Sequence, residues 1–550
     1  MCGIFSLLNS CVPENIIEQA FQKGSDRGPE SSVISVSGGG NMVMGFHRLA
    51  INGLTPASNQ PFIQENIKLI CNGEIYNYQE LYRMLDIEPK TGSDCEIIIH
   101  LYIRFGMERT LALLDGVFAF VLLDYDIMSD TAKVFVARDP FGVRPLYMCG
   151  PVHDKKSNTD MYGFASEMKC LIDIGVQIRH FLPGTYSIFE LGFQVCASWK
   201  PVRLGIRYHS PGIFTESCWA EDYSWIGPML KAQLIQAVHK RCLCTERPIA
   251  CLLSGGLDSS LVAALVATHY TRPIETYSIG LAGSTDLVYA RMVADHIGSN
   301  HTEVILTESE FLDAIPEVIE KIESYDTTTV RASIGNYLLA KYIREHSSAK
   351  VIFNGDGADE LMGGYLYCHK APNAVEFDEE CRRLLNDIHV FDVLRSDKSI
   401  SSNGLEPRTP FLDRTWVQAY LSVPATLRCH SLNGQPEKYL VRQLFSEDGL
   451  LPQDVLWRRK EAFSDGVSDT SRSLYQIIQE YVETVEIPSR TYFHNAPTTK
   501  EQAYYRWIFE TKYPGQGLII PYFWMPRFVE GATDASARTL QLYDDIAPVS

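Results

Sequence analysis

The chain has 550 residues, of which 45% are hydrophobic and 21% charged, a balance typical of a globular protein with several domains. Its formal net charge of −18 argues against binding to the phosphate backbone of nucleic acids, which needs a basic surface. No apolar run reaches the roughly 18 residues of a membrane span, and no basic segment of the secretory type opens the chain. We therefore expect a cytoplasmic protein without nucleic-acid or membrane partners.

Residues 1 to about 187 are rich in short β-prone runs, separated by Gly, Asn, Asp or Pro. The runs cover 3–8, 31–38, 43–51, 67–76, 117–126 and 133–139. Helical patterns at 14–24 and 93–106 interrupt them. Strands and helices without regular alternation predict a layered α+β domain, which we place at 2–187. Residues 181–191 look like the closing segment of this domain. Residues 188–212 have weak periodicity and are interpreted as a linker.

From about residue 228 strand and helix patterns alternate. A strand, a Gly-rich turn and an apolar helix fill 247–270, and the same plan returns at 349–365. Between them lie strand patterns at 274–281 and 301–307 and a helical pattern at 286–298. Alternation of this kind predicts a doubly wound parallel sheet of α/β type, with ligands bound at the carboxyl ends of its strands. Residues beyond 375 are mostly helical, and we take 213–535 as the second domain and 536–550 as a tail.

Cys2 stands directly behind Met1. If Met1 is removed, one residue carries both a thiol and a free α-amine, with ordinary pKa values of about 8.5 and about 7.7–8.0. An amine that is a base beside a thiol nucleophile can act as a catalytic pair. The alternative is that Cys2 only begins a buried strand, where cysteine packs as a small hydrophobe.

A Gly-rich loop, Ser254-Gly255-Gly256-Leu257-Asp258-Ser259-Ser260, follows the strand pattern IACLL and opens a helix. Glycines let backbone N–H groups approach an anion, and the helix N-terminus adds partial positive charge. The loop has neither the Walker pattern nor GxGxxG. It therefore predicts a phosphate-containing ligand.

This loop is similar to the pyrophosphate-binding loop of the ATP-pyrophosphatase family. Together with Cys2-Gly3-Ile4, it makes the chain resemble the glutamine-hydrolysing asparagine synthetases, and the animal type most closely, over nearly its whole length. The resemblance is carried by HRLAI (47–51), NGEIYN (72–77), LDGVFAF (114–120), RDPFGVRPL (138–146), ESYDTTTVRAS (323–333), GDGADE (355–360), PFLD (410–413), RRKEAFSDG (458–466), WMPRF (524–528) and DASARTL (534–540). It implies a layered αββα glutaminase domain of the N-terminal-nucleophile type, followed by an ATP-pyrophosphatase synthetase domain.

For the glutaminase domain the resemblance implies that Cys2 attacks the glutamine side chain and releases ammonia. Asn72 and Gly73, expected in a tight turn after a strand, would stabilise the oxyanion. By spacing alone the Asn-Gly pair would indicate a hairpin turn. Arg48 would bind the glutamine α-carboxylate, and Glu74 and Asp94 its ammonium group. The full glutamine-binding set is Arg48, Leu49, Ala50, Ile51, Asn52, Asn72, Gly73, Glu74 and Asp94.

For the synthetase domain the resemblance implies that aspartate attacks ATP to form β-aspartyl-AMP, which ammonia converts to asparagine. Lys460 would stabilise the charge on the phosphate, and Asp258 and Asp359 would hold Mg²⁺. The ATP-binding set is Leu253, Ser254, Gly255, Gly256, Asp258, Ser259, Ile279, Asn354, Gly355 and Arg331.

Two positions depart from the pattern of many relatives. Asn354-Gly355-Asp356 replaces Ser-Gly-Glu, so the carboxylate of Asp356, which we count among the catalytic groups, is one methylene shorter. Three alternatives stay open: another glutamine-dependent ligase, a β-lactam-forming ligase, or a non-catalytic relative. The expected substrates are aspartate, glutamine and ATP, and the expected assembly is a homodimer.

Overall fold

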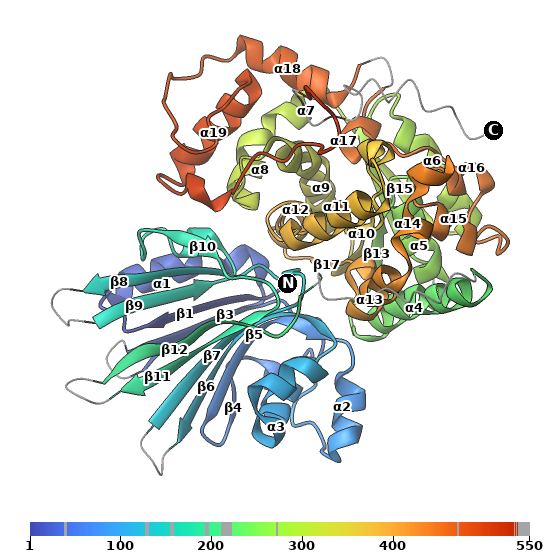
Figure 1. Ribbon diagram of the computed structural model, residues 1–550. Coiled ribbons are helices and arrows are strands. Elements are labelled where there is room, and N and C mark those ends of the chain that lie inside the picture. Colours follow the sequence, from blue (N-terminus) through green and yellow to red (C-terminus); the bar gives the residue numbers. More distant parts are fainter. Residues whose placement is uncertain are drawn as a thin grey trace. The chain divides into compact units, whose positions relative to one another are not determined.

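The computed structural model describes residues 1–37, 41–126, 131–154, 159–192, 197–210, 223–270, 273–469, 472–532, 534 and 536. The chain divides into two compact units (Figure 1). The first consists of Met1–Ser210 with Cys244–Arg247 and Ser401–Glu406, and the second of Pro211–Leu243, Pro248–Ile400 and Pro407–Ser550. Most of the expected tail at 536–550 lies outside the described residues.

The first unit contains two antiparallel sheets. Its strands are β1 (Gly3–Leu8), β2 (Ser31–Ser37), β3 (Met42–Arg48), β4 (Phe62–Gln64), β5 (Ile67–Ile75), β6 (Gly116–Asp126), β7 (Thr131–Arg138), β8 (Tyr147–Asp154), β9 (Thr159–Ala165), β10 (Ile178–His180), β11 (Thr185–Gly192) and β12 (Ser198–Arg207). Its helices are α1 (Glu14–Gln22), α2 (Tyr78–Leu85) and α3 (Ile97–Leu113). The strand orders are β10-β8-β9-β1-β3-β2 and β12-β11-β7-β6-β5-β4.

The two sheets face each other, and helices cover their outer faces. One buried cluster joins Ile4 and Phe46 of the first sheet to Val121 and Val136 of the second, which places it between the sheets. On the outer side of the first sheet, Phe21 of α1 stacks on His47, with 3.9 Å between the ring centroids. The layered αββα arrangement predicted from the sequence is therefore confirmed for this unit.

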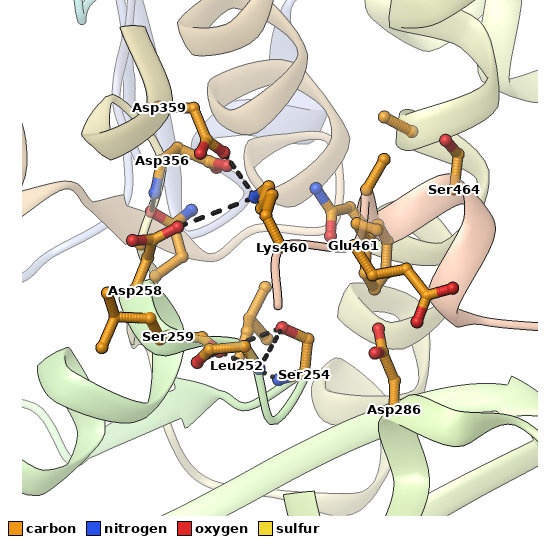
Figure 2. A pocket seen from close by; sticks show the side chains of 18 of the residues that line it. Leu252, Ser254, Asp258, Ser259, Asp286, Asp356, Asp359, Lys460, Glu461 and Ser464 are labelled. Atoms are coloured by element: carbon orange, nitrogen blue, oxygen red, sulfur yellow. Dashed lines mark hydrogen bonds and ion pairs between the residues drawn. The ribbon is translucent and has the colours of Figure 1, made fainter. Parts of the chain in front are cut away.

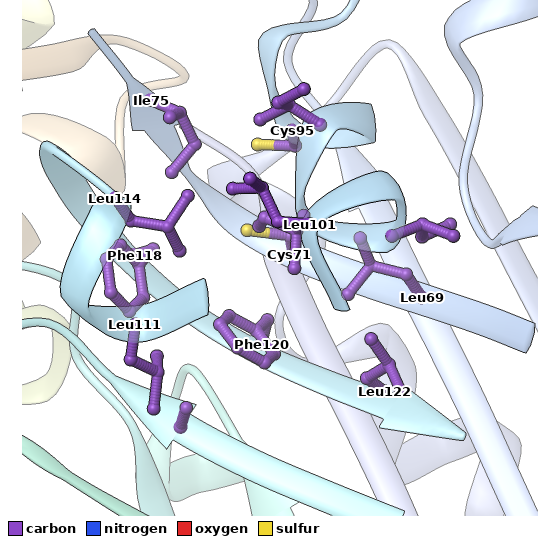
Figure 3. Packing of buried hydrophobic residues seen from close by; sticks show 14 of the residues in the cluster. Leu69, Cys71, Ile75, Cys95, Leu101, Leu111, Leu114, Phe118, Phe120 and Leu122 are labelled. Atoms are coloured by element: carbon purple, nitrogen blue, oxygen red, sulfur yellow. The ribbon is translucent and has the colours of Figure 1, made fainter. Parts of the chain in front are cut away.

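Strand β5 shows how the sequence positions residues on the two faces of a sheet. Leu69, Cys71 and Ile75 pack with α3 in an outer cluster (Figure 3). Ile70 instead joins the cluster between the sheets. Side chains alternate along a strand, so Asn72 shares the inner face with Ile70. This parity directs its amide group toward the inner cluster, against which Cys2 packs.

The end of the first unit differs from the predicted linker over 188–212. Residues 198–207 form strand β12, which pairs with β11 over most of its length. The pattern is hard to read because the strand is at the edge and most of its side chains are exposed, so hydrophobic alternation is weak. Helix α2 and strands β8–β10 also lie where no separate element is predicted.

The second unit is built on one sheet. Its strands are β13 (Ile249–Leu252), β14 (Glu275–Leu281), β15 (Asn300–Leu306), β16 (Val351–Phe353) and β17 (Glu406–Arg408). Its helices are α4 (Tyr223–Leu243), α5 (Leu257–His269), α6 (Thr285–Ile297), α7 (Glu308–Asp313), α8 (Ile315–Ile322), α9 (Thr327–His346), α10 (Ala358–Met362), α11 (Ala374–Asp387), α12 (Asp392–Ser401), α13 (Arg414–Ser422), α14 (Ala425–Arg428), α15 (Tyr439–Leu444), α16 (Gln453–Leu456), α17 (Phe463–Gly466), α18 (Leu474–Thr484) and α19 (Lys500–Lys512).

The strand order is β15-β14-β13-β16-β17, and β13 pairs in parallel with both β14 and β16. From β13 the chain runs outward through β14 and β15 and then returns to place β16 on the other side of β13. The predicted parallel sheet is confirmed, with this reversal between β13 and β16. At such a reversal the loops after the two strands diverge and leave room for a ligand. Among the described residues no helix is both long and apolar enough to cross a membrane.

Candidate active sites

The N-terminus of the first unit is buried with Met1 still attached. The Met1 amine donates a hydrogen bond to the Leu405 carbonyl at 3.2 Å, and burial lowers its pKa to about 5. The Cys2 Sγ lies 3.5 Å from the Leu49 carbonyl oxygen, and burial raises the pKa of the thiol to about 12. In this form the nitrogen of Cys2 is an amide and its thiol stays protonated at neutral pH.

Asn72 and Gly73 do not form the expected turn. Both lie within β5, where Asn72 pairs with Ala119 and Gly73 with Phe118 of β6. A Cβ atom on Gly73 would lie 2.3 Å from the Val117 carbonyl oxygen, so glycine is needed for the strands to approach. The prediction of a turn is wrong. Asn-Gly is a common turn sequence, but here the glycine is needed because β6 packs too close for a side chain.

A shared partner links Asn72 to the strand that begins after Cys2. Ser166 Oγ accepts a hydrogen bond from the Ile4 backbone N–H at 3.0 Å, and Asn72 Nδ2 donates to the same oxygen at 3.4 Å. The Asn72 side chain is fully buried. Its amide is therefore held at a fixed place next to β1, as a donor to an oxyanion must be.

Arg48 organises the loop that follows β3. Its guanidinium donates to the Gly53 carbonyl, to the Thr55 carbonyl at 3.0 Å and to Asn59 Oδ1 at 2.6 Å. A guanidinium has five N–H groups, so these three bonds leave donor capacity for a ligand carboxylate.

Residues 244–247, far along the chain, hold the segment that contains Ala50, Ile51 and Asn52. The Ile51 carbonyl accepts from the Glu246 N–H at 3.0 Å, and the Ala50 carbonyl accepts from Arg247 Nε at 2.8 Å. Asn52 Nδ2 lies 3.3 Å from the Cys244 carbonyl oxygen. These contacts fix the backbone of the expected glutamine-binding segment, and the sequence gives no sign of them.

Two carboxylates gather beside Asn52. Its Nδ2 donates to Glu74 Oε2 at 2.8 Å and lies 3.3 Å from Asp94 Oδ1, and the Ile75 N–H donates to Asp94 Oδ2 at 2.6 Å. Burial raises the pKa of Asp94 to about 6. Glu74 and Asp94 therefore form a buried acidic group of the kind that suits an ammonium ligand.

The Gly-rich loop of the second unit adopts the predicted strand–turn–helix geometry between β13 and α5. Ser254 Oγ and Ser259 Oγ are 3.0 Å apart, and the Ser254 N–H donates to Ser259 Oγ at 3.2 Å. Gly255 has φ +72°, and a Cβ there would lie 2.5 Å from the Ala290 nitrogen of α6. This close approach lets the loop fold against α6 while the N-terminus of α5 points to the ligand site.

A pocket opens over the ends of β13 and β16 (Figure 2). The sequence-predicted residues that line it are Leu253, Ser254, Gly256, Asp258, Ser259, Ile279, Asn354, Gly355, Asp356, Asp359 and Lys460. Gly255 and Arg331 are not among the lining residues. Arg331 instead donates from Nε to Glu501 at 2.8 Å and from Nη1 to Asp534 at 2.7 Å. Its guanidinium is therefore already paired with two carboxylates.

Asp258 and Asp359 face each other across the pocket, with ammonium groups between them. Lys460 Nζ is 2.6 Å from Asp359 Oδ2 and 3.8 Å from Asp258 Oδ2. Dashed lines mark both contacts in Figure 2. Burial opposes ionisation of Asp359, but the ammonium groups of Lys438 and Lys460 outweigh it and hold its pKa well below the usual range. Lys438 was missed by sequence reasoning, because it belongs to none of the quoted motifs and burial of a lysine cannot be read from local pattern.

Asn354 and Asp356 follow β16. Asn354 Nδ2 donates to Ser396 Oγ at 2.7 Å, and the Asp356 N–H donates to Asn354 Oδ1 at 3.3 Å. Burial raises the pKa of Asp356, while the guanidinium of Arg395, 3.5 Å away, acts to lower it. The Asp356 carboxylate, one methylene shorter than that of glutamate, is thus held inside the pocket by Arg395 as its counter-ion.

Comparison with known proteins finds a separate domain profile for each part of the chain. The glutamine amidotransferase domain profile matches residues 1–213, and the asparagine synthase profile matches 229–377 and 369–505. The chain is 43% identical to the asparagine synthetase [glutamine-hydrolyzing] of Gallus gallus over 99% of both chains. It belongs to the glutamine-hydrolysing asparagine synthetase family. The human relative of the same name is 40% identical, again over 99% of both chains.

Membership in this family makes the protein a ligase. Among solved structures, the NH3-dependent NAD synthetase from Campylobacter jejuni in complex with the nitrate ion covers 26% of this chain and 60% of its own. Its sequence identity is 20% and its TM-score 0.19.

Proposed function

We propose that the protein makes asparagine from aspartate and ATP, with ammonia that it releases from glutamine. One observation carries the proposal: the 43% identity to a glutamine-hydrolysing asparagine synthetase extends over 99% of both chains. Both halves of that reaction therefore have a counterpart in this sequence. AMP, pyrophosphate and glutamate are the other products.

In the glutaminase half, Cys2 is the proposed nucleophile once Met1 has been removed. The freed α-amine takes the thiol proton, and Sγ bonds to the side-chain carbonyl carbon of glutamine. The amine then passes that proton to the amide nitrogen, the C–N bond breaks, and ammonia leaves to give a thioester. Water then cleaves the thioester to glutamate. Asn72 Nδ2 and the Gly73 N–H are the proposed oxyanion donors, with Asn72 held by Ser166.

Glutamine recognition is assigned to the residues around Asn52. Arg48 would pair with the α-carboxylate, and the acidic group of Glu74 and Asp94 with the α-ammonium. Leu49, Ala50 and Ile51 would complete the site through their backbone. The short contacts of Asn52 to both acids support this assignment, because they keep two buried carboxylates directed at one point.

In the synthetase half, a β-carboxylate oxygen of aspartate attacks the α-phosphorus of ATP while the bond to the pyrophosphate oxygen breaks. Lys460 would stabilise the negative charge that develops on the phosphate oxygens. Ammonia then attacks the β-aspartyl carbon and AMP leaves. Asp356 is the proposed acceptor for the proton that ammonia loses, because a raised pKa suits a proton acceptor.

Mg²⁺ fits the same pocket. Among the described residues, Asp258 Oδ1 is a buried oxygen without a hydrogen-bond partner, and hard cations take such carboxylate oxygens together with phosphate oxygens. Asp258 and Asp359 would hold the ion, and it would neutralise charge on the triphosphate. Ser254, Gly256 and Ser259 would bind phosphate oxygens, and Leu253, Ile279, Asn354 and Gly355 the nucleoside.

The first experiment asks which amino acid drives pyrophosphate release. Aspartate should stimulate Mg²⁺-dependent conversion of ATP to AMP and pyrophosphate, and glutamate or a β-amino acid precursor should not. Formation of ADP and phosphate would contradict the adenylation step. Stimulation by a β-amino acid precursor would favour the β-lactam-forming alternative.

The second experiment tests the N-terminal nucleophile. Cys2→Ala should lower glutamine hydrolysis by at least about 10²–10⁴-fold, since the nucleophile and its adjacent base act together. Synthesis with ammonium chloride at high pH should continue. Mass spectrometry should find Cys2 at the mature N-terminus, and a protein that hydrolyses glutamine with Met1 attached would contradict the mechanism.

A cytoplasmic location and a homodimer stay predictions. Cell fractionation would test the location, and sedimentation equilibrium would test the homodimer.

A further inference from the structure

Lys438 occupies the space between the two carboxylates of the nucleotide pocket. Its Nζ lies 2.5 Å from Asp258 Oδ2 and 2.5 Å from Asp359 Oδ1. Its side chain is 1% exposed, whereas that of Lys460 is 20% exposed. Lys438 is therefore the more buried of the two ammonium groups and the one that contacts both acids directly.

The backbone around Lys438 is built to put it there. Lys438 precedes α15 with φ +59° and ψ 24°, in the left-handed region that non-glycine residues seldom adopt. Gly364 packs against the Lys438 side chain: a Cβ there would lie 2.0 Å from Lys438 Cε and 2.2 Å from Asp359 Oδ1. An uncommon backbone conformation and a glycine with no room for a side chain thus both serve the same lysine, and such strain concentrates at functional sites.

The charges of this group cancel. Asp258 and Asp359 contribute two negative charges, and Lys438 and Lys460 contribute two positive ones at contact distance. A divalent cation that entered alone would give these four side chains and the ion a net charge of two positive units, which is costly in a medium of low polarity. A divalent cation that entered with a triphosphate would bring more negative than positive charge.

We propose that Lys438 is a positioning residue that holds Asp258 and Asp359 together and excludes a free divalent cation until the nucleotide brings one. The metal thus enters as a complex with the nucleotide rather than ahead of it. This inference rests on the proposed function, because it takes the two aspartates as the metal ligands. Lys438 acts only through those aspartates, whereas Lys460 is the lysine proposed to contact the reacting phosphate.

The test uses Mn²⁺ as the probe, followed by electron paramagnetic resonance on the full-length protein. Wild type should bind Mn²⁺ only weakly without nucleotide and should take up one equivalent with α,β-methylene-ATP, which cannot be cleaved at the reacting bond. Lys438→Met removes the charge while keeping a long side chain. It should bind free Mn²⁺ at least tenfold more tightly than wild type, an increase that loss of structure would not produce.

Two further variants sharpen the comparison. Lys460→Met should tighten binding of free Mn²⁺ less than Lys438→Met, because Lys460 Nζ is 3.8 Å from Asp258. Lys231 lies on α4, pairs with Asp448 and does not line the pocket, so Lys231→Met is the matched control and should leave Mn²⁺ binding unchanged. Circular dichroism checks that each variant folds.

The outcomes separate the two proposals. Wild-type protein that binds free Mn²⁺ as tightly as the Mn²⁺–nucleotide complex overturns the role of Lys438, and this measurement needs no variant. Equal or weaker binding of free Mn²⁺ by folded Lys438→Met overturns it as well. Wild-type protein that binds neither form overturns the metal assignment of the proposed function itself.

Discussion

At the scale of single residues, substitution of Lys460 should separate the two proposed activities. It contacts Asp359 in the nucleotide pocket of the second unit, whereas the proposed glutamine site lies in the first. Lys460→Ala should abolish asparagine formation from either ammonia or glutamine, because both routes need the adenylate. Glutamine hydrolysis should stay within a few-fold of wild type. Loss of hydrolysis in a folded variant would show that the role assigned to Lys460 is wrong, and product analysis by amino-acid chromatography measures both activities.

Asp94, the proposed partner of the glutamine α-ammonium, should make glutamine hydrolysis depend on pH. Because burial raises its pKa to about 6, Asp94 is ionised above that pH and protonated below it. The protonated form loses its attraction for the α-ammonium of glutamine, so kcat/KM for glutamine should fall as pH drops through about 6. A pH series from 5 to 8 measures this, since kcat/KM reports groups of the free enzyme.

Asp94→Asn is the control for that series. The variant should have a kcat/KM for glutamine that is low at every pH and lacks the acidic limb. An acidic limb that persists unchanged in Asp94→Asn would assign it to another group, such as the N-terminal amine.

At the scale of elements, Gly73 shows what the pairing of β5 and β6 requires. A Cβ there would lie 2.3 Å from the Val117 carbonyl oxygen and 2.7 Å from Phe118 Cα, and both are backbone atoms that cannot turn aside. Gly73→Ala should therefore destabilise the first unit by about 1–3 kcal/mol and reduce glutamine hydrolysis. Urea unfolding, followed by circular dichroism, measures the change.

Gly192 on β11 provides the matched control. Among the described residues, a Cβ at Gly192 would meet only the Ser198 carbonyl oxygen at 3.8 Å, an ordinary contact. Gly192→Ala should change the free energy of unfolding by no more than about 0.5 kcal/mol. If both alanine variants unfold at the same urea concentration, the strand packing argument fails.

At the scale of the whole molecule, the first unit is not a continuous piece of chain. It includes 244–247 and 401–406, where Ser401 Oγ accepts from Arg27 Nη1 at 2.8 Å and Glu406 lies 3.9 Å from Arg144 Nη2. Arg27 and Arg144 are both buried. Removing such partners takes away buried polar contacts, at about 1–3 kcal/mol for each.

A fragment of residues 1–213, the range of the amidotransferase profile, should consequently unfold at a lower urea concentration than the same unit in the full chain. Its glutamine hydrolysis per folded molecule should fall too, because 244–247 support Ala50 and Ile51. A fragment as stable and as active as the intact protein would show that these segments are dispensable.

Local sequence was enough for several parts of the fold and the site. The alternation of strand and helix patterns after residue 228 predicted the parallel sheet, and the spacing of SGGLDSS between a strand and a helix predicted the ligand loop. Such features depend on neighbours a few residues apart, so they can be read locally. The motif residues Asp258, Asp359 and Lys460 do line one pocket.

Other parts were decided only by tertiary structure. Asn72-Gly73 became strand because β6 lies against it, β12 formed because β11 offers an edge, and Arg331 is balanced by Glu501 and Asp534. Lys438 reaches Asp258 across 180 positions of sequence. Sequence by itself thus determined which chemical groups the protein possesses and the periodicity of its elements. Folding decided which of those groups meet, because burial, close approach and charge balance depend on residues that are distant along the chain.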